Sequence, residues 1–240
     1  MELHETQKVQ VSKIGTDGNL SVVGSFQIIQ DAVTDLLCLY DLDAPTLRDK
    51  HNAIWLFVKT RAKFIKKLEC QEVFTVNAFV SYVSLAKMHV DVQIKNAHGE
   101  TALYSRTVLC ALDREKQSIR RLPTVGVNMN MPTRGEEIKI DFTDFVKTDL
   151  PLIDTVRVNS TNIDMSHHTN NVEYVRLIMN TYSVEQTESM NIRDMELIYT
   201  DQSYENDSLA VRKAVIDNTH YIVLEKIGSP VIKCEIVCEK

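Results

Sequence analysis

The sequence predicts an α+β protein made of two similar units, each with one long helix and a mostly antiparallel sheet. Residues 25–40 and 170–182 have the apolar spacing of a buried helix face. Each is followed by a long stretch in which apolar and polar residues alternate, as in strands. Because both helices are more apolar than a surface helix needs to be, we expect a sheet to curl around each one and the two sheets to join edge to edge.

The first unit is predicted over residues 1–125. Its helix carries apolar side chains on one face: Ile28, Ile29, Ala32, Val33, Leu36 and Leu37. Strands are expected over residues 53–64, 73–83, 88–96 and 102–113, with the turn "NAHGE" joining the last two as a hairpin. The strand at 88–96 alternates most clearly, with Met88, Val90, Val92 and Ile94 opposite His89, Asp91 and Gln93. This pattern predicts a sheet buried on one face.

A weakly patterned segment separates this unit from its repeat, so we predict a linker at residues 126–136 and a second unit at 137–240. The second helix should begin near Thr169 or Asn170, because cap-forming residues precede its apolar period. Strands are expected over residues 195–202, 208–216, 220–227 and 231–239.

Composition excludes several classes of protein. Hydrophobic residues make up 44% and charged residues 25%, as in a globular protein, and the net charge of -6 argues against a nucleic-acid binder. The N-terminus lacks a secretory signal, and no stretch approaches the roughly 20 apolar residues of a membrane span. Five cysteines without C-x-x-C spacing favour reduced thiols, with Cys234 and Cys238 in the core. We therefore expect a cytoplasmic protein without membrane insertion.

The stretch "NIDMSHHTNNVEYVRL" (162–177) places many polar side chains where the second helix begins. A helix N-terminus has free N–H groups and favours an anion or a developing oxyanion. Asp164 is suited to a general base or nucleophile, and equally to turn formation. Neighbouring histidines cannot face the same way, so a metal site is not expected and one histidine as a polariser is more plausible. Asn170 and Asn171 fit helix capping.

This stretch resembles the signature of the fatty acyl-acyl carrier protein thioesterases, D-x-N-x-H-x-N-N-x-x-Y, which opens the central helix of the second of two hot-dog units. The matching residues are Asp164, His168, Asn170, Asn171 and Tyr174, a spacing that selects His168 over His167. Residues 55–80 and 196–211 are similar to strands of the same family. The resemblance implies two tandem hot-dog units in one extended sheet, in agreement with the inferred repeat.

The implied reaction is hydrolysis of the thioester between a fatty acyl chain and acyl carrier protein, without a metal or organic cofactor. Asp164 is then the water-activating or nucleophilic carboxylate, and His168 a polariser or acid/base partner. The sequence departs from the family twice: Ser166 replaces an asparagine and Gln202 a glutamate. Both are assigned as orienting groups, and since glutamine cannot accept a proton, Asp164 must carry the base or nucleophile role alone.

The resemblance also assigns an acyl pocket to the first unit, with Ile29, Val33 and Trp55 as candidate lining residues and core packing as the alternative role. Asn170 and Asn171 are candidate substrate contacts. Acyl carrier protein is acidic, so a basic surface should bind it. Lys59, Arg61 and Lys63 alternate onto one strand face and are the candidates, the alternative being a solvated sheet face.

Two other functions stay open at this point. One is hydrolysis of coenzyme A thioesters by the same fold. The other is binding of acyl groups without catalysis, which the changes at Ser166 and Gln202 suggest. Asp164 and His168 argue against pure binding, which requires neither. Because a duplicated chain forms internally the sheet that single units make by pairing, we expect a monomer or a homodimer.

Overall fold

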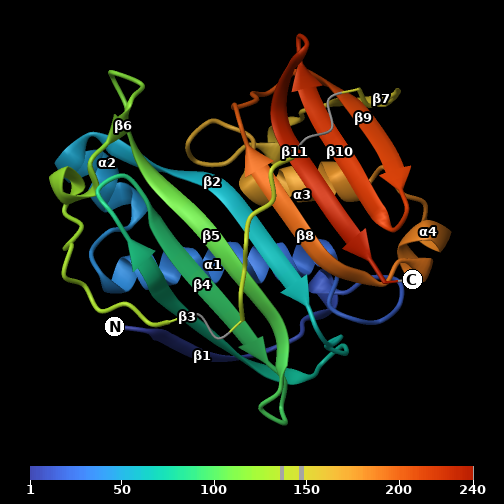
Figure 1. Cartoon of the computed structure of the whole chain (residues 1–240), viewed down its shortest axis with the longest axis horizontal. Coiled ribbons are helices and arrows are strands. Elements are labelled where there is room, and N and C mark those ends of the chain that lie inside the picture. Colours follow the sequence, from blue (N-terminus) through green and yellow to red (C-terminus); the bar gives the residue numbers. More distant parts are fainter. Residues whose placement is uncertain (136–137, 146–148, 240) are drawn as a thin grey trace.

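All strands in the described part of the chain belong to one antiparallel sheet, shown in Figure 1. The computed structural model describes residues 1–135, 138–145 and 149–239. In sheet order the first half is β1 (Leu3–Lys8), β3 (Val73–Val83), β4 (Met88–Lys95), β5 (Thr101–Asp113) and β2 (Ala53–Phe64). The second half is β8 (Ile192–Tyr199), β11 (Ser229–Cys238), β10 (Thr219–Lys226), β9 (Ser208–Ile216) and β7 (Leu152–Arg157). A short β6 (Ile119–Arg120) pairs with β5.

The two halves of the sheet repeat each other. Read from its outer edge inward, the first half runs β1, β3, β4, β5, β2, and the second runs β7, β9, β10, β11, β8. The halves meet where β2 pairs antiparallel with β8. This order confirms the predicted fold of two tandem hot-dog units joined into one extended sheet.

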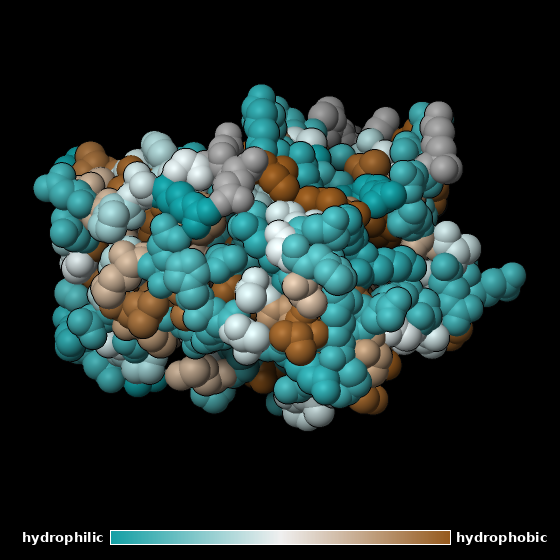
Figure 2. Space-filling view, turned by 90° about the horizontal axis from the view of Figure 1, so that it is seen from below, coloured by the Kyte–Doolittle hydropathy of each residue, from teal (hydrophilic) through white to brown (hydrophobic). Residues whose placement is uncertain are grey.

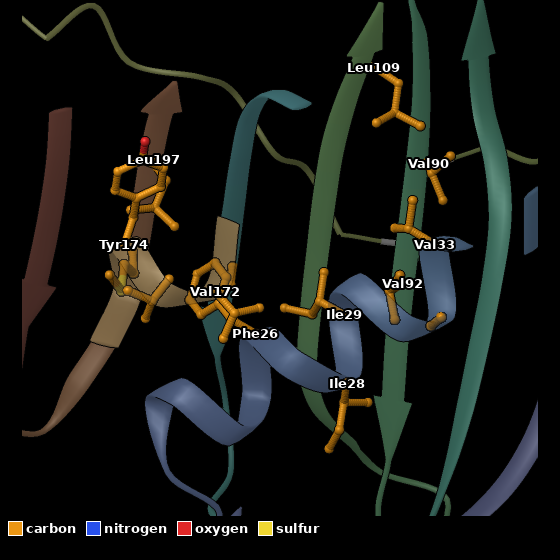
Figure 3. Close-up of a cluster of buried hydrophobic side chains, with 14 of the residues drawn as sticks. Phe26, Ile28, Ile29, Val33, Val90, Val92, Leu109, Val172, Tyr174 and Leu197 are labelled. Atoms are coloured by element: carbon orange, nitrogen blue, oxygen red, sulfur yellow. The ribbon is translucent and has the colours of Figure 1, made fainter. Parts of the chain in front are cut away.

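Each unit wraps its half of the sheet around one helix (Figure 1). Helix α1 (Val22–Leu39) is capped by Ser21, whose side chain accepts a hydrogen bond from the Gly24 amide, so it begins three residues earlier than predicted. Helix α3 (Asn171–Met179) is capped by Asn170, as expected. The two helices contact each other, and Phe26 and Val172 lie at this contact (Figure 3).

By length and composition alone, α1 would also suffice to cross a membrane, which the sequence did not predict. In the structure half of this helix is buried, and its apolar side chains pack against the sheet (Figure 3). Seen from below, the molecule is mostly hydrophilic, with small separate hydrophobic clusters (Figure 2).

Two short helices were not predicted, because neither has an apolar stripe. In α2 (Ala44–His51) the buried side chain is Leu47, and the helix is held by its Asp43 cap. Helix α4 (Val184–Ser189) buries no residue and begins with a capping box between Ser183 and Gln186. Local caps determine both helices, and hydrophobic periodicity does not detect them.

The prediction that β4 is buried on one face is wrong. Asp91 and Gln93, expected to face solvent, are 0% and 1% exposed. Residues 138–145 cross the outer face of the sheet in Figure 1, and Ile140 packs there against Phe79 and Tyr104. A connecting segment therefore gives the first unit a second, smaller apolar cluster on its outer face.

Asp91 is the acceptor of a buried polar network beneath that segment. Arg106 donates from Nε and Nη2 to its two carboxylate oxygens at 2.8 and 2.7 Å. Tyr104 and Ser81 donate their hydroxyls to the same carboxylate at 2.6 and 2.7 Å. The charge of Asp91 is thus compensated by a bidentate ion pair and two further donors.

The predicted linker is partly core. Val127 and Met131 are 3% and 6% exposed, and pack into the main hydrophobic cluster together with Leu122 and Val125. Residues 136 and 137, where the linker was predicted to end and the second unit to begin, lie outside the described residues. The boundaries between the units stay a prediction.

We expect Asp91→Ala to lower the free energy of unfolding by about 3–5 kcal/mol, because it removes the carboxylate that pairs the buried Arg106. Urea denaturation measures this change. The control is Glu100→Ala, which removes an exposed ion pair with Lys66 and should change stability little. Equal stability of the two variants would contradict the role given to Asp91.

Candidate active site

The predicted site residues lie on a tight turn that leads into α3. An isolated bridge pairs Ile163 with Thr169 at the base of this turn. The Asp164 amide donates to the His168 carbonyl at 3.0 Å, and the His167 amide donates to the Asp164 carbonyl at 3.0 Å. His167 has a φ of 64°, the left-handed conformation, which sends the adjacent histidines in different directions. His167 is exposed and His168 half-buried, so the turn itself distinguishes them.

Ser166 connects Asp164 to His168. Its backbone amide donates to Asp164 Oδ1 at 2.8 Å, and its hydroxyl donates to the same oxygen. The hydroxyl oxygen also lies 3.1 Å from His168 Nδ1. Since the serine proton is used by the carboxylate, Nδ1 must be the donor of this second bond, which leaves Nε2 of a neutral His168 as an acceptor. The three residues form a hydrogen-bonded chain.

Burial lowers the pKa of His168 below its ordinary value, an effect that Asp164 opposes and His167 reinforces. The Tyr204 ring covers the imidazole edge to face, with ring centroids 5.1 Å apart. The Lys226 ammonium group lies over the Tyr204 ring, 4.9 Å from the ring centre. At neutral pH these surroundings keep His168 in the uncharged form that the hydrogen-bonded chain requires.

A buried clamp holds the turn against the loop between β8 and β9. Thr169 donates its amide to the Ser203 carbonyl at 2.9 Å, and the two hydroxyls lie 2.7 Å apart. The Tyr174 hydroxyl accepts from the Ser203 amide at 3.0 Å. Tyr174, part of the recognised motif, is therefore buried and holds this loop beside the turn.

Gln202 lies on the clamped loop, next to Ser203. Its backbone carbonyl accepts a hydrogen bond from the Lys226 side chain at 3.1 Å, and its backbone amide donates to the Asp201 carboxylate at 2.8 Å. The bonds between Ser203 and Thr169 hold this loop against the Asp164 turn, and Gln202 is half-buried there.

Asn170 and Asn171 mark the start of α3. The Asn170 side chain accepts from the Val172 amide at 2.9 Å, and its carbonyl accepts from the Glu173 amide at 2.9 Å. Asn170 is therefore a helix cap, as the residue pattern suggested. Asn171 lines a small crevice between α1 and α3, together with Phe26, Ile29 and Tyr199.

The candidate acyl-pocket residues have different environments. Ile29 and Val33, one turn apart on α1, are both buried in the core, and Ile29 also lines the crevice at the start of α3. Trp55 is half-buried and donates its indole N–H to the Leu42 carbonyl at 2.7 Å, which ties β2 to the segment before α2. The structure brings only Ile29 of these three close to the helix that follows Asp164.

The basic side chains predicted to bind acyl carrier protein are engaged within the chain. Arg61 forms a bidentate pair with Asp194 at 2.8 and 3.0 Å and reaches Glu196 at 3.2 Å. Lys63 donates to the Lys139 carbonyl at 2.7 Å, and Lys59 lies 3.9 Å from Glu196. These contacts join β2 to β8 and to the crossing segment. They favour a structural role over a free docking surface.

Sequence reasoning missed Tyr204, Lys226 and Ser203 as parts of the site. Ser203 and Tyr204 fall inside the stretch 196–211 that resembles the family, but residue type alone gave them no role. Lys226 comes from β10, and only folding places it beside the loop. Within residues 1–135, 138–145 and 149–239, no group of three or more metal-binding side chains is found.

The second unit, which carries this turn, is similar to a known protein family. Residues 147–233 match the family model described as the acyl-ACP thioesterase C-terminal domain. Over this range the chain is therefore similar to the C-terminal domain of the acyl-ACP thioesterases. The matched range contains Asp164, Ser166, His168 and Gln202, so the similarity covers the unit with the hydrogen-bonded chain. No curated protein sequence matches the chain significantly.

Solved structures extend the similarity of fold to the whole chain. An acyl-ACP thioesterase from Bacteroides thetaiotaomicron is 17% identical with a TM-score of 0.90, covering 99% of this chain and 98% of that one. A putative oleoyl thioesterase from Lactobacillus plantarum is 13% identical with a TM-score of 0.88, covering 100% and 96%. A 12:0-ACP thioesterase from Umbellularia californica is 14% identical with a TM-score of 0.83, covering 99% and 97%. At these identities the matches establish the double hot-dog fold of the acyl-ACP thioesterases.

The turn that carries Asp164 and His168 should show a specific pH behaviour. Because burial lowers the pKa of His168, its ring should titrate at a lower pH than an ordinary histidine. Nuclear magnetic resonance of the imidazole carbons measures this titration in the free protein. In His167→Ala the pKa of His168 should rise, since a like charge is removed, and in Asp164→Asn it should fall. Shifts of opposite sign would contradict the described electrostatics.

Proposed function

We propose that this protein hydrolyses the thioester of fatty acyl-acyl carrier protein at the turn before α3, releasing a free fatty acid. The observation that carries the proposal is the hydrogen-bonded chain Asp164–Ser166–His168 within the unit that matches the thioesterase family model. Such a chain supplies both a carboxylate and a neutral imidazole to one reaction centre. Simple acyl binding requires neither group.

Asp164 is the water-activating or nucleophilic carboxylate of the proposed mechanism. Ser166 directs both of its donors at Oδ1. This leaves Oδ2 as the oxygen that faces a water molecule or the thioester carbon. In the first case Asp164 takes the proton of the attacking water, and in the second it forms an acyl-enzyme anhydride that water then hydrolyses.

His168 is the acid/base partner. With Nδ1–H held by Ser166, Nε2 is free to accept a proton. In the water route it takes the second proton of the attacking water as the tetrahedral intermediate collapses and gives it to the departing thiolate of the carrier. In the anhydride route the thiolate leaves first, and Nε2 takes a proton from the water that hydrolyses the anhydride. Ser166 thus replaces the expected asparagine as a shorter bridge between the two groups.

The start of α3 supplies the proposed oxyanion donor. Asn170 accepts from the amides of Val172 and Glu173. The Asn171 amide, first in the helix, has no such acceptor among the described residues and can donate to the developing oxyanion. Gln202, from the clamped loop, orients the attacking water without accepting its proton.

Acyl carrier protein is the proposed partner, and the protein is proposed to work in the cytoplasm without membrane insertion. The five free cysteines support a reducing compartment. We also propose that the chain acts as a monomer or a homodimer, because the pairing of β2 with β8 completes the long sheet within one chain.

Asp164→Ala should lower kcat for acyl-acyl carrier protein hydrolysis by about 10²–10⁴-fold, because the carboxylate acts directly on water or thioester. The assay follows release of free fatty acid from a panel of chain lengths on acyl carrier protein, with the matching coenzyme A thioesters alongside. The control is Asp154→Ala, which removes an exposed carboxylate on β7 and should retain activity.

Three outcomes would overturn parts of this proposal. No turnover of any thioester by the wild type rules out an enzyme, and unchanged turnover by Asp164→Ala rules out this assignment. Faster turnover of coenzyme A thioesters than of the carrier-protein thioesters identifies the other carrier as the substrate.

A further inference from the structure

The first unit contains a second copy of the turn that carries the proposed catalytic residues. Residues 14–21 precede α1 in the way that residues 163–170 precede α3. Each turn is closed by an isolated bridge, Ile14 with Leu20 and Ile163 with Thr169. Each also has a left-handed residue at the same place, Gly18 with φ 76° and His167 with φ 64°.

The backbone hydrogen bonds of the two turns correspond one to one. Gly15 donates to the Asn19 carbonyl at 2.8 Å, as Asp164 donates to that of His168 at 3.0 Å. Leu20 donates to the Leu68 carbonyl at 2.7 Å, as Thr169 donates to that of Ser203 at 2.9 Å. The same turn backbone therefore occurs in both units. In the first unit Gly15 stands at the position of Asp164, and Asn19 at the position of His168.

A large cavity opens beside this second turn. Its volume is about 490 Å³, within the range of roughly 300–1,000 Å³ typical of small-molecule sites. Apolar side chains from both units form most of its wall: Leu20, Val23, Phe64, Leu103, Met179 and Met190. In Figure 1 the loop before α1, helix α4 and the C-terminus lie together at this end of the molecule.

The cavity is separate from the proposed catalytic turn. It borders Met179 and Asn180, at the C-terminal end of α3. The catalytic turn precedes Asn171, at the other end of this nine-residue helix, a span of about 13 Å at 1.5 Å per residue. The crevice at the catalytic end has different lining residues, including Phe26, Ile29 and Asn171.

Charged side chains also line the cavity. Three are basic, Lys66, Lys67 and Arg193, and two are acidic, Asp17 and Glu188. Lys66 pairs with Glu100 at 2.6 Å and Lys67 with Asp17 at 2.8 Å, and both lysines are about half exposed, at 45% and 58% of their side chains. Such exposed pairs are weak, so a ligand anion can compete for the lysines.

We propose that this cavity binds a free fatty acid, with its chain among the apolar residues and its carboxylate beside Lys66. An apolar wall next to a basic rim matches an amphiphile with a single negative head. Gly15 and Asn19 stand at the positions of Asp164 and His168, so this turn lacks the carboxylate and imidazole pair proposed for hydrolysis, and we assign it binding alone. Since its wall includes the end of α3, a bound fatty acid contacts the helix that begins at the catalytic turn. This inference extends the proposed function by adding a binding site for its class of product.

The experiment uses a dodecanoate-length fatty acid that carries a photoreactive diazirine, followed by mapping of the labelled peptides. Wild-type protein should be labelled within residues 179–193, in competition with dodecanoate. Thr187→Trp, which fills the cavity from α4, should weaken dodecanoate binding there by about 10-fold or more. Glu185→Trp, on the same helix but away from the cavity, should bind as wild type does.

A second pair of variants tests the head group without changing the cavity's shape. Lys66→Gln should weaken dodecanoate binding by about 2- to 5-fold and leave dodecanol binding unchanged. Lys87→Gln, an exposed lysine elsewhere, should have neither effect.

Hydrolysis of acyl-acyl carrier protein is measured on the same variants and should be unchanged in Thr187→Trp at low product concentration. Labelling confined to residues 164–174, or labelling of 179–193 that survives in Thr187→Trp, overturns the proposal. A loss of hydrolysis in correctly folded Thr187→Trp also overturns it, because the cavity would then hold the substrate's own acyl chain. If wild type lacks hydrolysis but shows the expected labelling, the proposed function fails and this site stands.

Discussion

The structure depends on the pairing of β2 with β8, because this seam turns two half-sheets into one surface long enough to cover both apolar helices. Arg61 crosses the seam to Asp194 and Glu196, and the segment at residues 138–145 covers these charges from outside. With the seam in place, α1 and α3 pack against each other on the inner face. This packing fixes where α1 and α3 begin, and with them the turns at residues 14–21 and 163–170.

Much of this fold follows from patterns in the sequence, and the exceptions have physical reasons. The strands at 53–64, 73–83 and 208–216 were predicted at the bounds that the structure shows, since alternation directly reports the side-chain period of a strand. The outer face of β4 was mispredicted because Ile140 covers it from a distant segment without periodic pattern. Long-range burial of this kind is not encoded in the alternation of the buried strand itself.

Parts of the candidate site could likewise be predicted from the sequence, and other parts only the structure shows. The resemblance selected His168 over His167, and the left-handed backbone at His167 gives the physical reason. Spacing could not show that Ser166 bridges Asp164 and His168, that Tyr204 covers the imidazole, or that Arg61 is used within the sheet. The duplication repeats the backbone of the turn, while the carboxylate of Asp164 and the imidazole of His168 occur in one copy only. Each unit can then take a separate role.

The central claim is that Asp164, Ser166 and His168 act as one hydrogen-bonded unit. A double-mutant cycle on kcat for acyl-acyl carrier protein hydrolysis tests it, with Ser166→Ala, His168→Ala and the double variant. If Ser166 acts through His168, the double variant should be about as slow as His168→Ala alone, since residues that act as a unit are strongly non-additive. Losses that multiply in the double variant would show independent roles and contradict the account.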